Sequence, residues 1–138
     1  TEKNHDHPSM VGALGLLPGT LIDPQIMRNT ILKVKACWEW ESAWGWDFPM
    51  CAMTAARLGE PGLALDFLLM NATKNTYLPN GHNYQRPGLW AYLPGNGGLL
   101  TAVAMMAAGW GGTEGRSNPG FPQDGSWSIK WEGLSPLL

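Results

Sequence analysis

The spacing of apolar residues along the chain predicts a mainly α-helical protein. Between residues 23 and 38 an apolar side chain recurs every three or four positions, at Met27, Ile31, Val34 and Trp38. This interval places all four on one face of a helix, which is then buried against the rest of the molecule. Asp23 is a good N-cap and Pro24 is tolerated in a first turn, so the helix is expected to begin there.

Proline and glycine mark the ends of four further helices. These are expected at residues 8–17, 47–58, 61–72 and 99–108. Gly59 can end one helix in the left-handed conformation and Pro61 can begin the next, so residues 50–72 should form an antiparallel pair of helices. The last helix, opened by residues 96–98, is nearly all apolar and should be buried on every side.

Residues 73–95 and 111–138 lack the helical spacing. The first stretch is rich in Asn, Gly, Pro and Tyr, and a loop longer than about 15 residues in a compact domain usually carries function. In the second, Trp127, Ile129 and Trp131 alternate with polar residues, which is typical of a half-buried strand. Because one strand is not stable alone, its partner is expected in a missing upstream part. The sequence thus divides into a partial helical toroid, 1–110, and a loop and strand, 111–138, that begin a β-domain.

The composition is that of a globular domain. Hydrophobic residues make up 44% of the 138 positions and charged residues 14%, which is too apolar for a disordered chain. The net charge is -2 and the basic residues are scattered, so no nucleic-acid partner is expected. No apolar run reaches the roughly 18 residues that a membrane span needs. No motif calls for a cofactor, so none is expected.

The two cysteines, Cys37 and Cys51, lie among apolar helical residues. We expect two buried free thiols, because free cysteine behaves as a small hydrophobic residue. A disulfide between them is the alternative, since spacing alone does not show proximity.

Tryptophan is the most unusual feature of the composition. The chain has eight, and Trp38, Trp40, Trp44 and Trp46 fall within nine positions. Indole rings can stack on the C–H faces of sugars while their N–H groups donate to hydroxyls, but they also pack the interior between helices. Because carboxylates are interleaved with this cluster, we favour a carbohydrate site, with Trp40, Trp44 and Trp46 as binding residues.

Three acids in or beside the cluster are the candidate catalytic residues: Glu41 first, then Glu39 and Asp47. Glycoside cleavage generally needs two carboxyl groups, one that donates a proton and one that activates water or attacks directly. An acid between indoles loses solvation, which raises its pKa and suits a general acid. Asp47 could instead be a plain helix N-cap, and each Glu an exposed charge or a backbone N–H acceptor. In an extended loop, Glu39 and Glu41 would share one face.

A second polar group is expected to bind sugar hydroxyls. It comprises Asn80, His82, Asn83, Tyr84, Gln85 and Arg86, followed by Trp90 and Asn96. Amides, imidazole, phenol and guanidinium offer the donors and acceptors that hydroxyls need. The alternative is a turn-rich surface loop bonded to water, with Asn96 first a helix cap and then a ligand.

Residues 4–7 form a third group. Two imidazoles and Asp6 could bind a metal together with His82, but metal sites normally need three or four convergent ligands. No metal is therefore expected. Asp6 or His7 could contribute to a cleft, and otherwise this segment begins the N-terminal helix.

Several of these motifs occur in a recognisable order. They are Trp40-x-x-Ala43-Trp44, Ala56-Arg57-Leu58-Gly59, a long loop, and Pro94-Gly95-Asn96 before an apolar helix. This order resembles the last hairpins of the six-hairpin glycosidases, which are (α/α)6 toroids. Residues 44–50, 80–85 and 92–98 look like signatures of relatives of the α-L-fucosidases, glycoside hydrolase family ninety-five. Residues 120–134 look like the start of the small β-domain that follows the toroid.

Two departures limit what the resemblance implies. In the fucosidase pattern an Asp stands just before the Gly-Asn pair and serves with the catalytic base, whereas this chain has Pro94 there. The Ala-Arg-Leu-Gly element also lies further from the tryptophan-rich loop. Fucosidase specificity is therefore not expected, but the architecture and the cleft location are.

The resemblance implies the C-terminal fragment of a bacterial glycoside hydrolase, periplasmic or secreted, acting on an oligo- or polysaccharide. The fragment alone is expected to be inactive, because the opposing wall of the cleft belongs to the remainder of the parent chain.

One alternative function is that of a polysaccharide lyase. Tyr84 or Tyr92 and His82 would then abstract a proton, and Arg86 would neutralise the carboxylate of a uronate. Another is a non-catalytic sugar-binding module, which Pro94 favours. A helical protein-interaction scaffold would leave the clustering of Trp and carboxylates unexplained.

Overall fold

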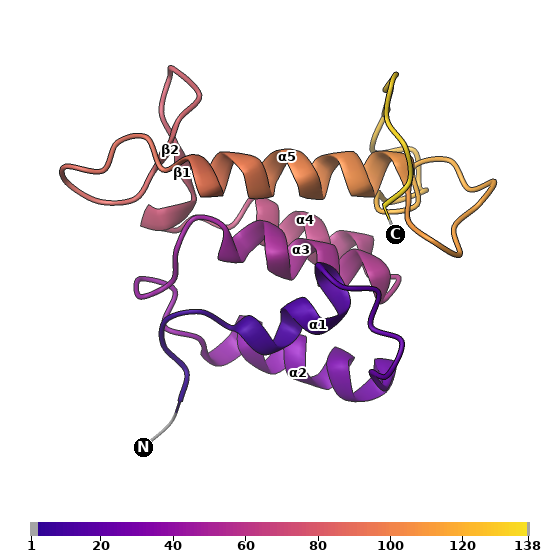
Figure 1. The fold of residues 1–138 in the computed structure, drawn as a ribbon, viewed down its shortest axis with the longest axis horizontal. Helices are drawn as coiled ribbons and strands as arrows, with labels where there is room; N and C mark the ends of the chain where they lie inside the picture. Colours follow the sequence, from indigo (N-terminus) through magenta and orange to yellow (C-terminus); the bar gives the residue numbers. More distant parts are fainter. Residues whose placement is uncertain (1–2, 138) are drawn as a thin grey trace.

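The computed structural model describes residues 3–137 and is mainly helical, with one small antiparallel sheet (Figure 1). The elements are a 3₁₀ turn (Ser9–Val11), α1 (Gly12–Gly15), α2 (Pro24–Cys37), α3 (Asp47–Arg57), α4 (Pro61–Leu68), a second 3₁₀ turn (Thr73–Asn75), β1 (Thr76–Tyr77), β2 (Asn83–Tyr84) and α5 (Leu93–Ala108). The predicted mainly helical class is confirmed.

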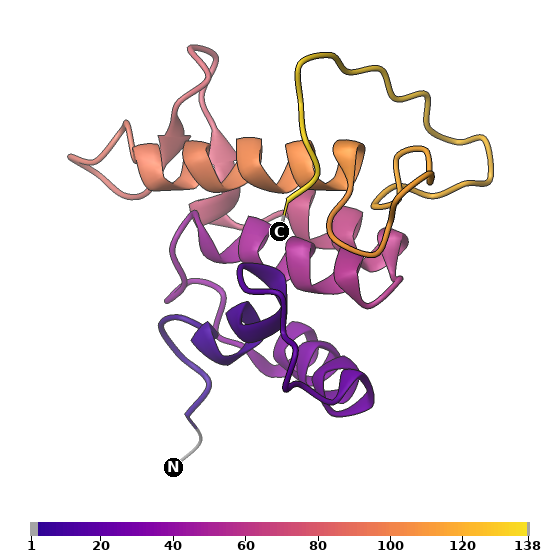
Figure 2. The same ribbon diagram turned by 45° about the vertical axis from the view of Figure 1, so that its right-hand side comes forward.

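Helix α3 lies at the centre of the molecule. It contacts α4 beside it, α5 on one side and α1 and α2 on the other, so the helices form three layers (Figures 1 and 2). Ten of its eleven residues are buried. Small residues such as Ala52, Ala55 and Ala56 make up much of its surface, which lets the neighbouring helices approach from several directions.

Helix α2 begins as the sequence predicts. The Asp23 carboxylate accepts hydrogen bonds from the backbone N–H groups of Gln25 and Ile26, at 2.8 and 3.0 Å, and Pro24 occupies the first turn. Met27, Ile31 and Val34 are buried. The predicted apolar face is therefore confirmed.

The turn between α3 and α4 is also as predicted, because Gly59 has a φ of 75°. Helix α4, however, ends at Leu68 and not near residue 72. The Asn75 amide donates to the carbonyl oxygens of Leu68 and Met70, each at 3.0 Å. These bonds satisfy the last carbonyls of the helix and allow the chain to leave it early.

Helix α5 begins at Leu93, earlier than predicted, and ends before Gly109, whose φ is 96°. The prediction that it is buried on every side is wrong. Ala102, Met105 and Met106 face the core, whereas Leu93 and Leu100 are 62% and 70% exposed. Helix α5 forms the outer layer, so only one of its faces has a neighbour. Neither α5 nor any other helix within residues 3–137 has the length and apolar character to cross a membrane.

The predicted strand at residues 127–131 is wrong. Within residues 111–137 the structure has no strand, and the β pairing there is an isolated bridge between Trp110 and Leu137. The chain returns to the end of α5, where Leu137 donates to the Gly109 carbonyl at 2.9 Å. Trp127 and Trp131 are 42% and 46% exposed. Alternation alone does not make a strand when no neighbouring strand offers backbone partners.

The two cysteines are free and lie in different environments. Cys51 is buried in α3, as predicted, but Cys37 is exposed at the end of α2. Cys37 falls outside the buried stripe of its helix, which is why its predicted burial is wrong. Burial raises the pKa of the Cys51 thiol well above its ordinary value of 9.0, and the charge of Asp47 raises it further. Cys51 is therefore an unreactive thiol in the folded state.

A thiol reagent should consequently modify one cysteine per folded chain. Iodoacetamide at mildly alkaline pH should alkylate Cys37 rapidly and Cys51 only after denaturant unfolds the protein, as read by peptide mass mapping. Cys37→Ser should make the folded chain unreactive. Rapid native-state labelling of Cys51 would contradict the buried position of α3.

Candidate functional site

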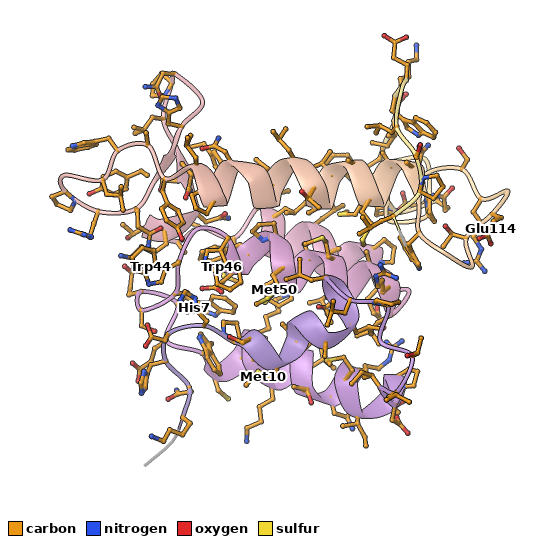
Figure 3. All side chains as sticks on the ribbon, viewed as in Figure 1. His7, Met10, Trp44, Trp46, Met50 and Glu114 are labelled. Carbon is orange, nitrogen blue, oxygen red and sulfur yellow. The ribbon has the colours of Figure 1, made fainter. Side chains whose placement is uncertain are left out.

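The predicted site residues gather at one end of the helical layers. The N-terminal ends of α3 and α5, the loop of residues 38–46, the β1–β2 hairpin and the segment around His7 all lie there (Figures 1 and 3). The rings of Trp44 and Tyr92 are 5.3 Å apart, and the Tyr77 hydroxyl donates to the Gly95 carbonyl at 3.2 Å. Segments far apart in sequence are thus joined at this end.

His7 and Asp47 form the most tightly connected pair of ionisable side chains at this end. The Nδ1 atom of His7 lies 2.9 Å from Oδ2 of Asp47 and 3.2 Å from Oδ1. The Asp47 side chain is fully buried, whereas the His7 side chain is 34% exposed. The imidazole therefore joins a buried carboxylate to the molecular surface.

Asp47 is the first residue of α3 and not its N-cap, which is Trp46. Its Oδ2 accepts the backbone N–H of Trp44 at 2.7 Å, so the carboxylate closes the turn that precedes the helix. Burial raises the pKa of Asp47 above 3.8, and the bonds from Trp44 and His7 oppose that shift. Of the three candidate acids, Asp47 is the one that loses its solvation.

Aromatic side chains surround the His7–Asp47 pair (Figure 3). The ring centroid of His7 is 4.7 Å from Trp46 and 6.2 Å from Trp44. Tyr92 also lies at this end, with its ring centroid 5.3 Å from that of Trp44. Burial, followed by the charge of Asp47, raises the pKa of Tyr92, so its hydroxyl keeps its proton at neutral pH.

Two buried amides fix the hairpin to the tryptophan-rich loop. Gln85 accepts the Gly45 N–H at 3.0 Å and donates to the Ala43 carbonyl at 3.5 Å. Asn83 donates to the carbonyls of Lys74 and Thr76, at 3.0 and 3.1 Å. Both side chains are fully buried. They were expected to bind sugar hydroxyls, but they hold backbone together and are not accessible to a ligand.

Asn83 is wedged between two glycines. A Cβ atom at Gly45 would lie 1.8 Å from Asn83 Oδ1, and one at Gly95 would lie 2.2 Å from it. This oxygen is buried and has no hydrogen-bond partner among residues 3–137. Glycine is therefore required at both positions for the loop, the hairpin and α5 to meet.

Asn96 likewise acts inside the fold. It lies in the first turns of α5, accepts the Asn83 N–H at 3.0 Å and donates to the Gly81 carbonyl at 2.7 Å. It is therefore not the helix cap, and both the oxygen and the nitrogen of its amide already form hydrogen bonds within the fold. Trp40 packs against Phe48 and Phe67, at centroid distances of 5.3 and 5.8 Å, so it belongs to the core.

A pocket of about 390 Å³ lies beside the hairpin. Its lining comprises Asn71, Ala72, Thr73, Thr76, Leu78, Tyr84 and Trp90. The rings of Tyr84 and Trp90 are 5.0 Å apart. The Thr73 hydroxyl donates to Glu41 Oε1 at 3.2 Å. The structure thus brings the first candidate acid to the pocket that contains two of the predicted aromatic ligands.

The remaining candidates are exposed. Glu39 and Glu41 both face solvent, and the chain turns between them, since Ser42 donates to the Glu39 carbonyl at 2.8 Å. The extended loop assumed for these acids is therefore wrong, and neither is desolvated by the indoles. Asn80, His82 and Arg86 are exposed on the hairpin. Asn80 accepts the His82 N–H at 3.1 Å.

The chemistry available at this end is thus of two kinds. One arrangement is an imidazole on a buried carboxylate, and the other is an aromatic pocket with an exposed acid at its edge. Among residues 3–137, no three His, Cys, Asp or Glu side chains converge so as to hold a metal ion. Comparisons of the chain with protein-family models, with curated proteins and with solved structures gave no match.

The wedge of Asn83 predicts different effects for two alanine substitutions in one helix. Gly95→Ala should lower the free energy of unfolding by about 1–3 kcal/mol, because the new methyl group overlaps Asn83. Gly97→Ala meets nothing within 4 Å and should be neutral or stabilising by up to about 1 kcal/mol. Urea denaturation of both variants measures the difference. Equal stabilities would contradict the close contact.

The burial of Asp47 predicts a pH dependence of stability. Because its folded-state pKa is raised above 3.8, the folded protein holds this proton more tightly than the unfolded chain does. The contribution of Asp47 therefore becomes less favourable as pH rises from about 4 through the raised pKa. Relative to Asp47→Asn, the unfolding free energy of the native protein should fall over that window. Urea denaturation at several pH values measures both free energies. If the free energy of unfolding changed with pH in the same way for the native protein and for Asp47→Asn, the prediction would be contradicted.

Proposed function

We propose that this chain forms part of the saccharide-binding cleft of a glycoside hydrolase with a helical-toroid architecture. The observation that carries the proposal is the pocket lined by Tyr84 and Trp90, with Glu41 at its edge. The layered helices, in which α3 and α4 pack side by side after a tight turn, support the toroid architecture.

The pocket has the size and the lining that a sugar ring requires. Its volume of about 390 Å³ falls in the range of small-molecule sites. Trp90 is 57% exposed although its ring is large and apolar, and Tyr84 lies at 48° to it. Such rings gain contact area when the C–H face of a sugar covers them. Asn71 and Thr73 supply an amide and a hydroxyl for the polar edge of the ring.

Burial separates the roles of the three candidate acids. Glu41 is exposed and hydrogen-bonded to a residue of the pocket, so it can donate a proton to the oxygen that leaves when a glycosidic bond breaks. Glu39, two residues earlier, is also exposed and is the second candidate carboxylate. Asp47 has no exposed surface and cannot touch a substrate. Asp47 can therefore act on a substrate only through His7.

Binding to the pocket is tested with Trp90→Ala. Methyl glycosides of glucose, galactose, mannose, xylose and fucose are titrated into the protein, and binding is followed by NMR chemical shifts. Trp90→Ala should weaken any binding roughly tenfold, the loss expected for a well-packed aromatic contact. Trp131→Ala removes an equally large ring that is 46% exposed elsewhere, and should leave binding unchanged. Equal effects of the two variants would contradict the pocket assignment.

Catalysis is tested separately with Glu41→Gln. The variant is made in the full-length parent protein, since the chain alone is expected to be inactive. Release of reducing ends from oligosaccharides by that protein should fall by roughly 10²–10⁴-fold, the usual contribution of a general acid, while binding is retained. Asp66→Asn, on an exposed acid of α4 that pairs with Lys35, is the matched control. Binding without cleavage by the full-length parent would favour a sugar-binding module over a hydrolase. Unsaturated products absorbing in the near ultraviolet would instead show a lyase.

A further inference from the structure

The pair formed by His7 and Asp47 has the geometry of an acid–base dyad. We infer that Nε2 of His7 accepts a hydrogen bond from a hydroxyl of a bound saccharide, with Asp47 as its positioning residue. This inference rests on the proposed function and extends it to a group 40 residues away from Asp47 in sequence.

The first argument is the direction of the imidazole. Its Nδ1 atom is 2.9 Å from a carboxylate oxygen that has no proton to offer when ionised, so Nδ1 must carry the hydrogen of the neutral ring. The lone pair then belongs to Nε2. Within residues 3–137 no hydrogen bond to Nε2 is present, and the side chain is 34% exposed. The basic atom is thus available to a ligand.

The second argument is the burial of the carboxylate. Taking an ionised group out of water is costly, and it is retained where other groups compensate for the lost solvation. The Trp44 N–H and His7 are the two compensating partners of Asp47. The same contact fixes Nδ1 of His7 and with it the orientation of the imidazole ring.

The third argument is the set of ionisable groups around the pair. Asp6 is the other nearby acid and is exposed, while Tyr92 and Cys51 lie close to Asp47. Burial raises the pKa of both Tyr92 and Cys51, so both stay neutral near pH 7. Among the groups named here, the Asp47 carboxylate is therefore the charge in direct contact with His7.

The rings of Trp46 and Trp44 beside the imidazole limit water on that side and fix the plane of the ring.

His5 provides an internal control for the dyad. It lies two residues before His7 and pairs with Asp6 at 3.9 Å, but both side chains are more than half exposed. An ordinary surface pair of this kind contributes little and fixes no ring orientation. His82 is likewise exposed on the hairpin. A fixed tautomer and a response to bound ligand should therefore be observed at His7 and not at His5 or His82.

The tautomer of His7 is the first measurement and needs no ligand. Long-range ¹H–¹⁵N NMR spectra of the labelled protein should show neutral His7 protonated on Nδ1 and unprotonated on Nε2. Asp47→Asn, which keeps the shape of the side chain, should lose this preference. A neutral His7 protonated on Nε2 in the native protein would overturn the inference even if the variant fails to fold.

The second measurement uses the same methyl glycosides. Binding should shift the Nε2 resonance of His7 and leave that of His5 unmoved. His7→Gln should weaken binding roughly three- to tenfold, the loss of one hydrogen bond, whereas His5→Gln should not. Binding that depends on Trp90 but leaves His7 unaffected would overturn the dyad and spare the proposed function. No binding by any glycoside would overturn the proposed function, and the dyad's saccharide role with it.

Discussion

Because ten successive residues of α3, from Asp47 to Ala56, are buried, the other helices of the molecule have to pack around this helix. Layers form on two sides of it, and the chain must pass its N-terminal end when it enters from the loop of residues 38–46. An acidic residue at that end is then inside the protein. It is tolerated because the Trp44 N–H and the His7 imidazole satisfy it.

A second constraint, close backbone approach, holds the site together. Gly45 and Gly95 come from the loop and from α5, and both contact the same amide oxygen of Asn83. Gln85 then ties the same hairpin to Ala43 and Gly45. The hairpin that carries Tyr84 is thereby fixed to the loop that carries Trp44. The aromatic pocket and the His7–Asp47 pair therefore belong to one end of the molecule, whose segments are joined by hydrogen bonds.

Local signals in the sequence predicted the helices. The features that the sequence did not predict depend on contacts between residues far apart in the chain. Asp23 and Gly59 define helix ends through their own backbone chemistry, so their roles are visible in one residue. Asn83 and Gln85 lie in a stretch of polar residues, so the sequence predicts that their side chains are exposed. The glycines at positions 45 and 95, which leave room for the Asn83 side chain, are the one sequence feature that could have indicated its burial. The approach of His7 to Asp47 across 40 residues follows from the packing of the N-terminal segment on α3. Helix α5 is as apolar as a buried helix, but its place in the outer layer decides its exposure.

Burial also assigns different chemistry to acids that the sequence presents as equals. Glu39, Glu41 and Asp47 occur within nine positions, yet two face solvent and one has no exposed surface. An exposed carboxylate can meet a glycosidic oxygen but receives no electrostatic help from a low dielectric. A buried carboxylate cannot reach the glycosidic oxygen, but it acts on the group that it contacts. Here that group is the imidazole of His7, which is partly exposed at the surface. A site that needs both access and a fixed imidazole orientation can obtain them from such a division, because His7 contacts the buried Asp47 and is itself partly exposed.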